Sequence, residues 1–168
     1  MGPLSFLSLP LLYVFVCASA APLHSRQTSP ITCSNSSAAI DLGADVEGVQ
    51  FQLTEINPFI SIADPAPIFS AQLALLNASA ISSKLESLAL FPTFVPPAGD
   101  VLPPTALDDL NSALAAAQAH IAAINVTDSV VKDVFQNNTV AVQKANEFIG
   151  MAVAQAQGQN LGCTVAAA

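Results

Sequence analysis

The stretch ALDDLNSALAAAQAHIAAI at residues 106–124 decides the fold class of this protein. Its apolar side chains recur in steps of three and four, the spacing of one face of an α-helix. This stripe consists of Leu107, Leu110, Leu114, Ala117, Ile121 and Ile124. Thr105 stands where an N-cap is expected, and Asp108 and Asp109 fall in the first turn, where the helix dipole favours negative charge. An amphipathic helix is therefore predicted over residues 105–124.

Three further segments have helical periodicity. We expect helices over residues 38–57, over residues 67–90, and from an N-cap at Thr127 or Asp128 as far as Gln157, where Gly158 is the expected C-cap. The stripe of the first is Leu42, Val46, Val49, Leu53 and Ile56. The stripe of the second is Phe69, Leu73, Leu76, Ala80, Leu85 and Leu88. The stripe of the last is Val131, Val134, Phe135, Val142, Ala145, Phe148, Ile149, Ala152 and Val153.

Two cysteines frame this helical region. Cys33 precedes the first helix and Cys163 follows the last, whereas Cys17 lies in a segment that we expect to be removed. Four helices with short connections alternate in direction, which brings the start of the first and the end of the fourth together. The sequence therefore predicts an all-α, antiparallel four-helix bundle (up-down-up-down) closed by one disulfide between these cysteines. We expect no sheet, although residues 59–62 and 90–95 could form strands.

The beginning of the chain predicts export. Residues 4–16 form an apolar run, shorter than the ~20 residues of a membrane span, and Ala18 and Ala20 follow as a small-residue cleavage signature. We expect a signal peptide at residues 1–20, a flexible polar arm at 21–37, the bundle at 38–163 and a tail at 164–168. Four sequons for N-linked glycosylation agree with a secreted, extracellular protein; they begin at Asn35, Asn77, Asn125 and Asn137.

Composition excludes several partners. Twelve acidic and four basic residues give a formal net charge of −8, which argues against nucleic acid and anionic membranes. Polar residues interrupt every predicted helix, so we expect no membrane span.

Few residues suggest chemistry. His24 lies in the arm, which leaves His120 as the only imidazole of the domain, and no nucleophile can be paired with a base. Asp41 and Asp45 are one helical turn apart, a spacing that can serve calcium binding or acid–base catalysis but is more often a solvated polar face. We therefore predict a non-enzymatic protein with no metal and no cofactor.

The functional prediction depends on a group of phenylalanines at the margins of the stripes and between the helices. The candidates for apolar ligand binding lie at stripe edges or in loops: Phe51, Phe59, Phe69, Phe91 and Phe94. Helical bundles hold apolar ligands between helices or expose an apolar patch. The favoured function is binding of a lipid-like molecule or a hydrophobic surface. The alternative is a structural or interaction module that binds a cell-wall component or inhibits a secreted enzyme.

Behind the predicted signal peptide and polar arm, the predicted helices are rich in Ala, Leu and Val, as in ALDDLNSAL at residues 106–114 and VAVQKA at residues 140–145. In this pattern the chain resembles the fungal hydrophobic-surface-binding and cell-wall galactomannoprotein family. The resemblance covers about residues 38–157 at the level of pattern. It implies a helical, non-enzymatic protein of the cell wall or the extracellular medium. Such a protein adsorbs to hydrophobic surfaces or holds a fatty acid between its helices.

Overall fold

The computed structural model describes residues 31–59, 62–91, 101–127 and 138–165. Along the chain the elements are β1 (Ile31–Cys33), α1 (Ser36–Glu55), α2 (Ala66–Leu90), α3 (Ala106–Ala122), α4 (Asn138–Ala156), α5 (Gly158–Leu161) and β2 (Cys163–Val165). The predicted signal peptide, Phe94 and residues 128–137 of the predicted last helix, Asn137 among them, lie outside the described residues.

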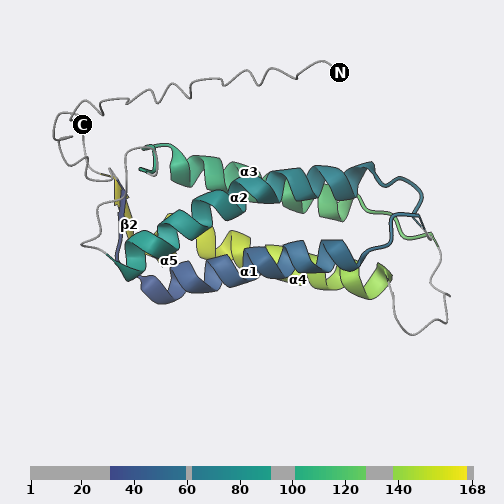
Figure 1. Cartoon of the computed structure of the whole chain (residues 1–168), viewed down its shortest axis with the longest axis horizontal. Helices are drawn as coiled ribbons and strands as arrows, with labels where there is room; N and C mark the ends of the chain where they lie inside the picture. The colour runs from purple at the N-terminus through teal and green to yellow at the C-terminus, as the bar shows by residue number, and fades with distance from the viewer. Residues whose placement is uncertain (1–30, 60–61, 92–100, 128–137, 166–168) are drawn as a thin grey trace, which may run out of the picture.

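The four long helices form the predicted antiparallel bundle. Helix α1 packs against α2 and α4, and α3 packs against the same two helices, so that each helix has two neighbours around a square. In Figure 1, α2 and α3 form the upper pair and α1 and α4 the lower pair. The up-down-up-down topology and the disulfide between the chain ends are confirmed.

Three of the predicted stripes face the core. Every residue of the α1 stripe is buried, and so are Leu110, Leu114, Ala117 and Ile121 of α3. The stripe of α4 continues this core through Ala145, Ile149 and Ala152. Because many buried positions hold alanine, the helix backbones can approach closely.

The predicted stripe of α2 is wrong. The buried residues of α2 are Ile68, Ala71, Leu75, Ala78, Ser82 and Leu85, of which only Leu85 belonged to the prediction. Phe69, Leu73 and Leu76 are exposed instead. Helix α2 is apolar on two sides, and the side with Ala71 and Ala78 faces the core because small residues let this helix lie close to its neighbours.

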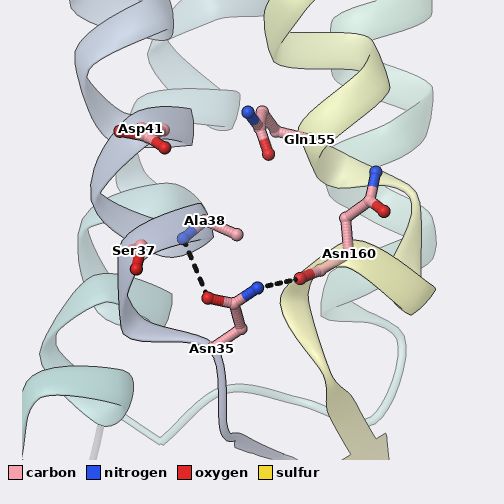
Figure 2. A pocket seen from close by; sticks show the side chains of 6 residues that line it. All are labelled: Asn35, Ser37, Ala38, Asp41, Gln155 and Asn160. Atoms are coloured by element: carbon pink, nitrogen blue, oxygen red, sulfur yellow. Dashed lines mark hydrogen bonds between the residues drawn. The ribbon is translucent and has the colours of Figure 1, made fainter.

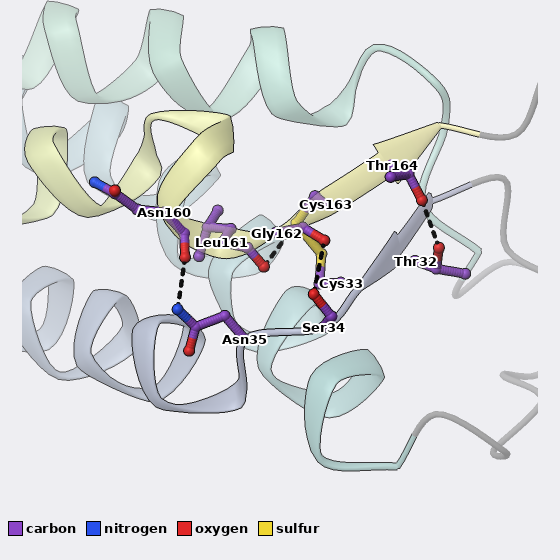
Figure 3. Close-up of a disulfide and its surroundings, with 9 residues drawn as sticks. All are labelled: Thr32, Cys33, Ser34, Asn35, Asn160, Leu161, Gly162, Cys163 and Thr164. Carbon is purple, nitrogen blue, oxygen red and sulfur yellow. Dashed lines mark hydrogen bonds between the residues drawn. A yellow bond between two sulfur atoms is a disulfide. The ribbon is translucent and has the colours of Figure 1, made fainter.

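The two chain ends meet in a small sheet that the sequence did not predict. Strands β1 and β2 are antiparallel, and the register places Cys33 opposite Cys163, which form the disulfide (Figure 3). Thr32 and Thr164 form a further pair through their hydroxyl groups at 2.9 Å. Part of the expected arm and of the expected tail therefore belongs to the folded domain.

The end of α4 also differs from the prediction. Gly158 is not a C-cap, because it opens the short helix α5. The residue that ends this helix is Gly162, whose φ of 57° is in the left-handed region where glycine is favoured. A Cβ atom at Gly162 would also collide with the Ser34 hydroxyl, so the turn into β2 requires glycine.

The opposite end of the bundle is held by side chain–backbone and backbone contacts between segments distant in the sequence. Asn138, buried at the start of α4, accepts a hydrogen bond from the Asn57 backbone N–H at 3.0 Å and donates to the Asn57 carbonyl at 3.2 Å. Ile62 and Val126 form an isolated antiparallel bridge. These contacts connect the end of α1 to α4, and the loop before α2 to the loop after α3.

Candidate functional site

The outer side of α2 carries several large apolar side chains that are exposed. Phe69, Leu73 and Leu76 are 54%, 67% and 62% exposed, and their spacing of four and three residues aligns them on one face. We call these three residues the α2 stripe. It extends for about 10 Å along the helix, given a rise of about 1.5 Å per residue. Leu90 and Phe91 are also exposed, at the far end of the same helix.

The surface around the α2 stripe has little charge. From Ala66 to Ser83, α2 contains no Asp, Glu, Lys or Arg. The second half of the neighbouring α3, from Leu110 to Ala122, contains none either. Because α2 and α3 are antiparallel, these two uncharged segments lie side by side. Four acidic residues lie on α1 instead, so the charge of this acidic protein is unevenly distributed.

The five predicted Phe candidates do not form one site. Phe69 belongs to the α2 stripe and Phe91 lies at the C-cap of α2, whereas Phe94 lies outside the described residues. Phe51 is exposed on the side of α1 opposite its buried stripe, and Phe59 is 91% exposed in the loop after α1. The structure therefore exposes Phe69 together with Leu73 and Leu76, the three residues that the sequence analysis had placed on the core-facing stripe of this helix. An excess of apolar residues around α2 was the signal that could have revealed them.

A hollow of about 420 Å³ between the start of α1 and the α4–α5 region is polar (Figure 2). It is lined by Asn35, Ser37, Ala38, Asp41, Gln155 and Asn160. Such a lining suits a hydroxylated or amide-bearing group and not an alkyl chain.

Of the aspartate pair of α1, Asp41 lines this hollow and Asp45 lies one helical turn further along. Partial burial, and to a lesser extent the neighbouring Asp41 carboxylate, raises the pKa of Asp45. Within the described residues no group of three or more His, Cys, Asp or Glu side chains could hold a metal ion. His120, the other candidate for chemistry, is half-buried in the last turn of α3.

The sequons occupy different surroundings. Asn77 is exposed in the middle of α2 and about 70° around the helix from the centre of the α2 stripe, at 3.6 residues per turn. A glycan there would flank the stripe. Asn125 is exposed in the loop after α3, where its backbone carbonyl accepts a hydrogen bond from the N–H of Ala63. Asn35 lines the polar hollow.

No family model matches this chain, and neither does any curated protein or solved structure. Among the described helices, none has a long enough apolar window to cross a membrane. The α2 stripe and the polar hollow are the two surface features of the described residues that could bind a partner.

Proposed function

We propose that this protein is secreted and non-enzymatic, and that it adsorbs to hydrophobic or lipid-like surfaces through the α2 stripe. The observation that carries the proposal is the exposure of Phe69, Leu73 and Leu76 on one face of α2. Contiguous exposed apolar surface of this kind is typical of interaction sites. The same activity is implied by the resemblance to hydrophobic-surface-binding proteins.

The charge distribution supports a surface as the partner. Approach to a low-dielectric surface removes water from nearby groups, which is costly for ions and favourable for apolar side chains. The uncharged segments of α2 and α3 avoid that cost, whereas the four acidic residues of α1 lie on a different helix. The net charge of −8 makes two copies repel each other, which opposes stripe-to-stripe association.

Adsorption fits the described structure better than transport of an apolar molecule between the helices. The large side chains of α1 and α3 that point inward, such as Leu42 and Leu114, are fully buried in a core shared with many alanines. The hollow of about 420 Å³ is polar. An alkyl chain would gain more from the α2 stripe than from that hollow.

The test is adsorption of detergent-free protein to an alkane-coated sensor and to zwitterionic lipid vesicles. The variant Leu73→Gln/Leu76→Gln removes two exposed apolar side chains without touching the core. If each leucine contributes about 1–1.5 kcal/mol on contact, affinity should fall about 30- to 150-fold. The matched control is Ile40→Gln/Met151→Gln, on α1 and α4, where the side chains are 41% and 44% exposed. Equal losses in both variants would refute the role of the α2 stripe.

Native mass spectrometry before and after organic extraction distinguishes the carrier alternative. The proposal predicts an intact monomer without a bound apolar molecule. A molecule released by extraction would instead favour a ligand held between the helices. A loss of binding to a protein or wall partner in the α2 variant, with unchanged surface adsorption, would favour the interaction-module alternative.

A further inference from the structure

The side chain of Asn35 is fixed in one orientation by two contacts. Its Oδ1 accepts a hydrogen bond from the Ala38 backbone N–H at 3.2 Å, which caps α1. Its Nδ2 donates to the backbone carbonyl of Asn160 at 2.7 Å. Figure 2 shows this amide at the edge of the polar hollow, between α1 and α5. Figure 3 shows the same contact near the disulfide.

Asn35 is also the first residue of a sequon, because Ser37 follows two positions later. We propose that the polar hollow seats the first sugar of an N-linked glycan attached to Asn35. In the transfer, Nδ2 attacks C1 of an N-acetylhexosamine carried on a lipid diphosphate. The C1–N bond forms, the bond from C1 to the diphosphate oxygen breaks, the lipid diphosphate leaves, and Nδ2 loses one proton.

The hydrogen bond to Asn160 remains possible after the modification. An asparagine amide nitrogen carries two hydrogens, of which glycosylation replaces one. The other can still donate to the Asn160 carbonyl, while Oδ1 continues to cap α1. The attached sugar therefore begins at the edge of the hollow, held by an amide that the fold already orients.

The remaining lining has the chemistry of a sugar site. The Asp41 carboxylate accepts hydrogen bonds from hydroxyl groups, and the Gln155 amide both donates and accepts. Figure 2 shows these two side chains on opposite sides of the hollow, one from α1 and the other from α4. Its volume of about 420 Å³ is within the range of about 300–1,000 Å³ for small-molecule sites, which one sugar ring and its N-acetyl group can occupy.

Folding does not prevent the modification, because the partner of Asn35 is made much later. Asn160 lies 125 residues further along the chain. At about 5–20 residues per second, the ribosome needs on the order of 10 s to synthesise this length of chain. The glycan is therefore attached to an open chain, and the hollow forms beside its first sugar when α4 and α5 pack against α1.

The inference rests on the proposed secretion and not on the α2 stripe. The test uses the full chain secreted from a eukaryotic host, with glycopeptide mapping by mass spectrometry. Native protein is then treated with a glycosidase that cleaves the bond between sugar and asparagine. We expect Asn35 to be glycosylated and its glycan to be released at least tenfold more slowly in the folded protein than after reduction and denaturation. Asn77 is also exposed but does not line the hollow, so it serves as the internal comparison.

Variants connect the protection to the hollow. Asp41→Ala and Gln155→Ala should accelerate release at Asn35 and leave release at Asn77 unchanged, whereas Glu47→Ala, exposed on α1 outside the hollow, should change neither. An unmodified Asn35 beside a glycosylated Asn77 would overturn this inference alone. Equal release rates in folded and denatured protein, or no acceleration in the hollow variants, would also overturn it. Absence of glycan from every sequon would contradict the proposed secretory route as well.

Discussion

Two glycines in facing helices give opposite predictions for the same substitution. A Cβ atom added at Gly48 in α1 would lie 2.8 Å from Cδ1 and 3.0 Å from Cγ of Phe148 in α4. A Cβ atom added at Gly150, also in α4, meets no atom within 4 Å. Glycine in a helix interior is about 1 kcal/mol less favourable than alanine, and this gain applies to both positions. The packing of Phe148 therefore decides the difference.

For Gly150→Ala we expect the free energy of unfolding to rise by about 1 kcal/mol, because only the helix propensity changes. For Gly48→Ala, overpacking costs about 1–3 kcal/mol, which cancels or exceeds the gain. The net change should lie between about 0 and 2 kcal/mol of destabilisation. In a domain of this size, 1 kcal/mol corresponds to about 3–5 °C in Tm.

The assay is urea unfolding followed by circular dichroism at 222 nm, with the disulfide intact. A double-mutant cycle adds Phe148→Leu, a smaller side chain that leaves room for the new methyl group. In that background, Gly48→Ala should stabilise the protein by about 1 kcal/mol, as Gly150→Ala does. If Gly48→Ala and Gly150→Ala stabilise the unmodified chain equally, the close contact of α1 with α4 at Phe148 is refuted.

Three further predictions follow from other contacts. Asn138→Ala removes both hydrogen bonds to Asn57 and should destabilise the protein by about 2 kcal/mol in the same unfolding assay. The control is Asn146→Ala at an exposed position of α4, and an equal loss of stability in both variants would contradict a stabilising role of the Asn138–Asn57 hydrogen bonds. Asp45→Asn should stabilise the protein at neutral pH. Because folding raises the pKa of the Asp45 carboxyl, the unmodified protein loses stability as the pH rises through the ordinary value of 3.8 toward the raised one and this group ionises. Unfolding curves should therefore show the benefit of the substitution at pH 7 and not at pH 3. Cys33→Ser/Cys163→Ser removes a disulfide over a sequence separation of 130 and should lower the free energy of unfolding by up to about 5 kcal/mol. Adding reductant to the unmodified protein should give the same loss of stability. An unchanged denaturation midpoint would contradict a stabilising role of the disulfide.

The helical bundle could be predicted because its evidence is local. Residues 106–124 have a single apolar face, so only one side of that helix can be buried, and the structure buries it. The positions of Cys33 and Cys163 outside four alternating helices were sufficient to predict that the chain ends meet. Helix periodicity and the order of elements carry this information without any knowledge of packing.

The surface used for the proposed function could not be predicted in the same way. Helix α2 has two apolar faces, and periodicity alone does not state which of them faces the other helices. The choice depends on how closely the backbones approach, which small residues such as Ala71 and Ala78 decide only in the assembled bundle. Leu73 and Leu76 are therefore exposed although the sequence analysis assigned them to the core.

The polar hollow and the β1–β2 sheet depend on the tertiary structure for a related reason. Asn35 could be recognised as the start of a sequon, but its contact with Asn160 joins residues 125 positions apart. Strands of three residues have too little sequence to show an alternating pattern, and β1 and β2 exist because the bundle and the disulfide bring them together. Local periodicity determines which helices form, whereas the closest packing of these helices determines which side chains remain available to a surface or a sugar.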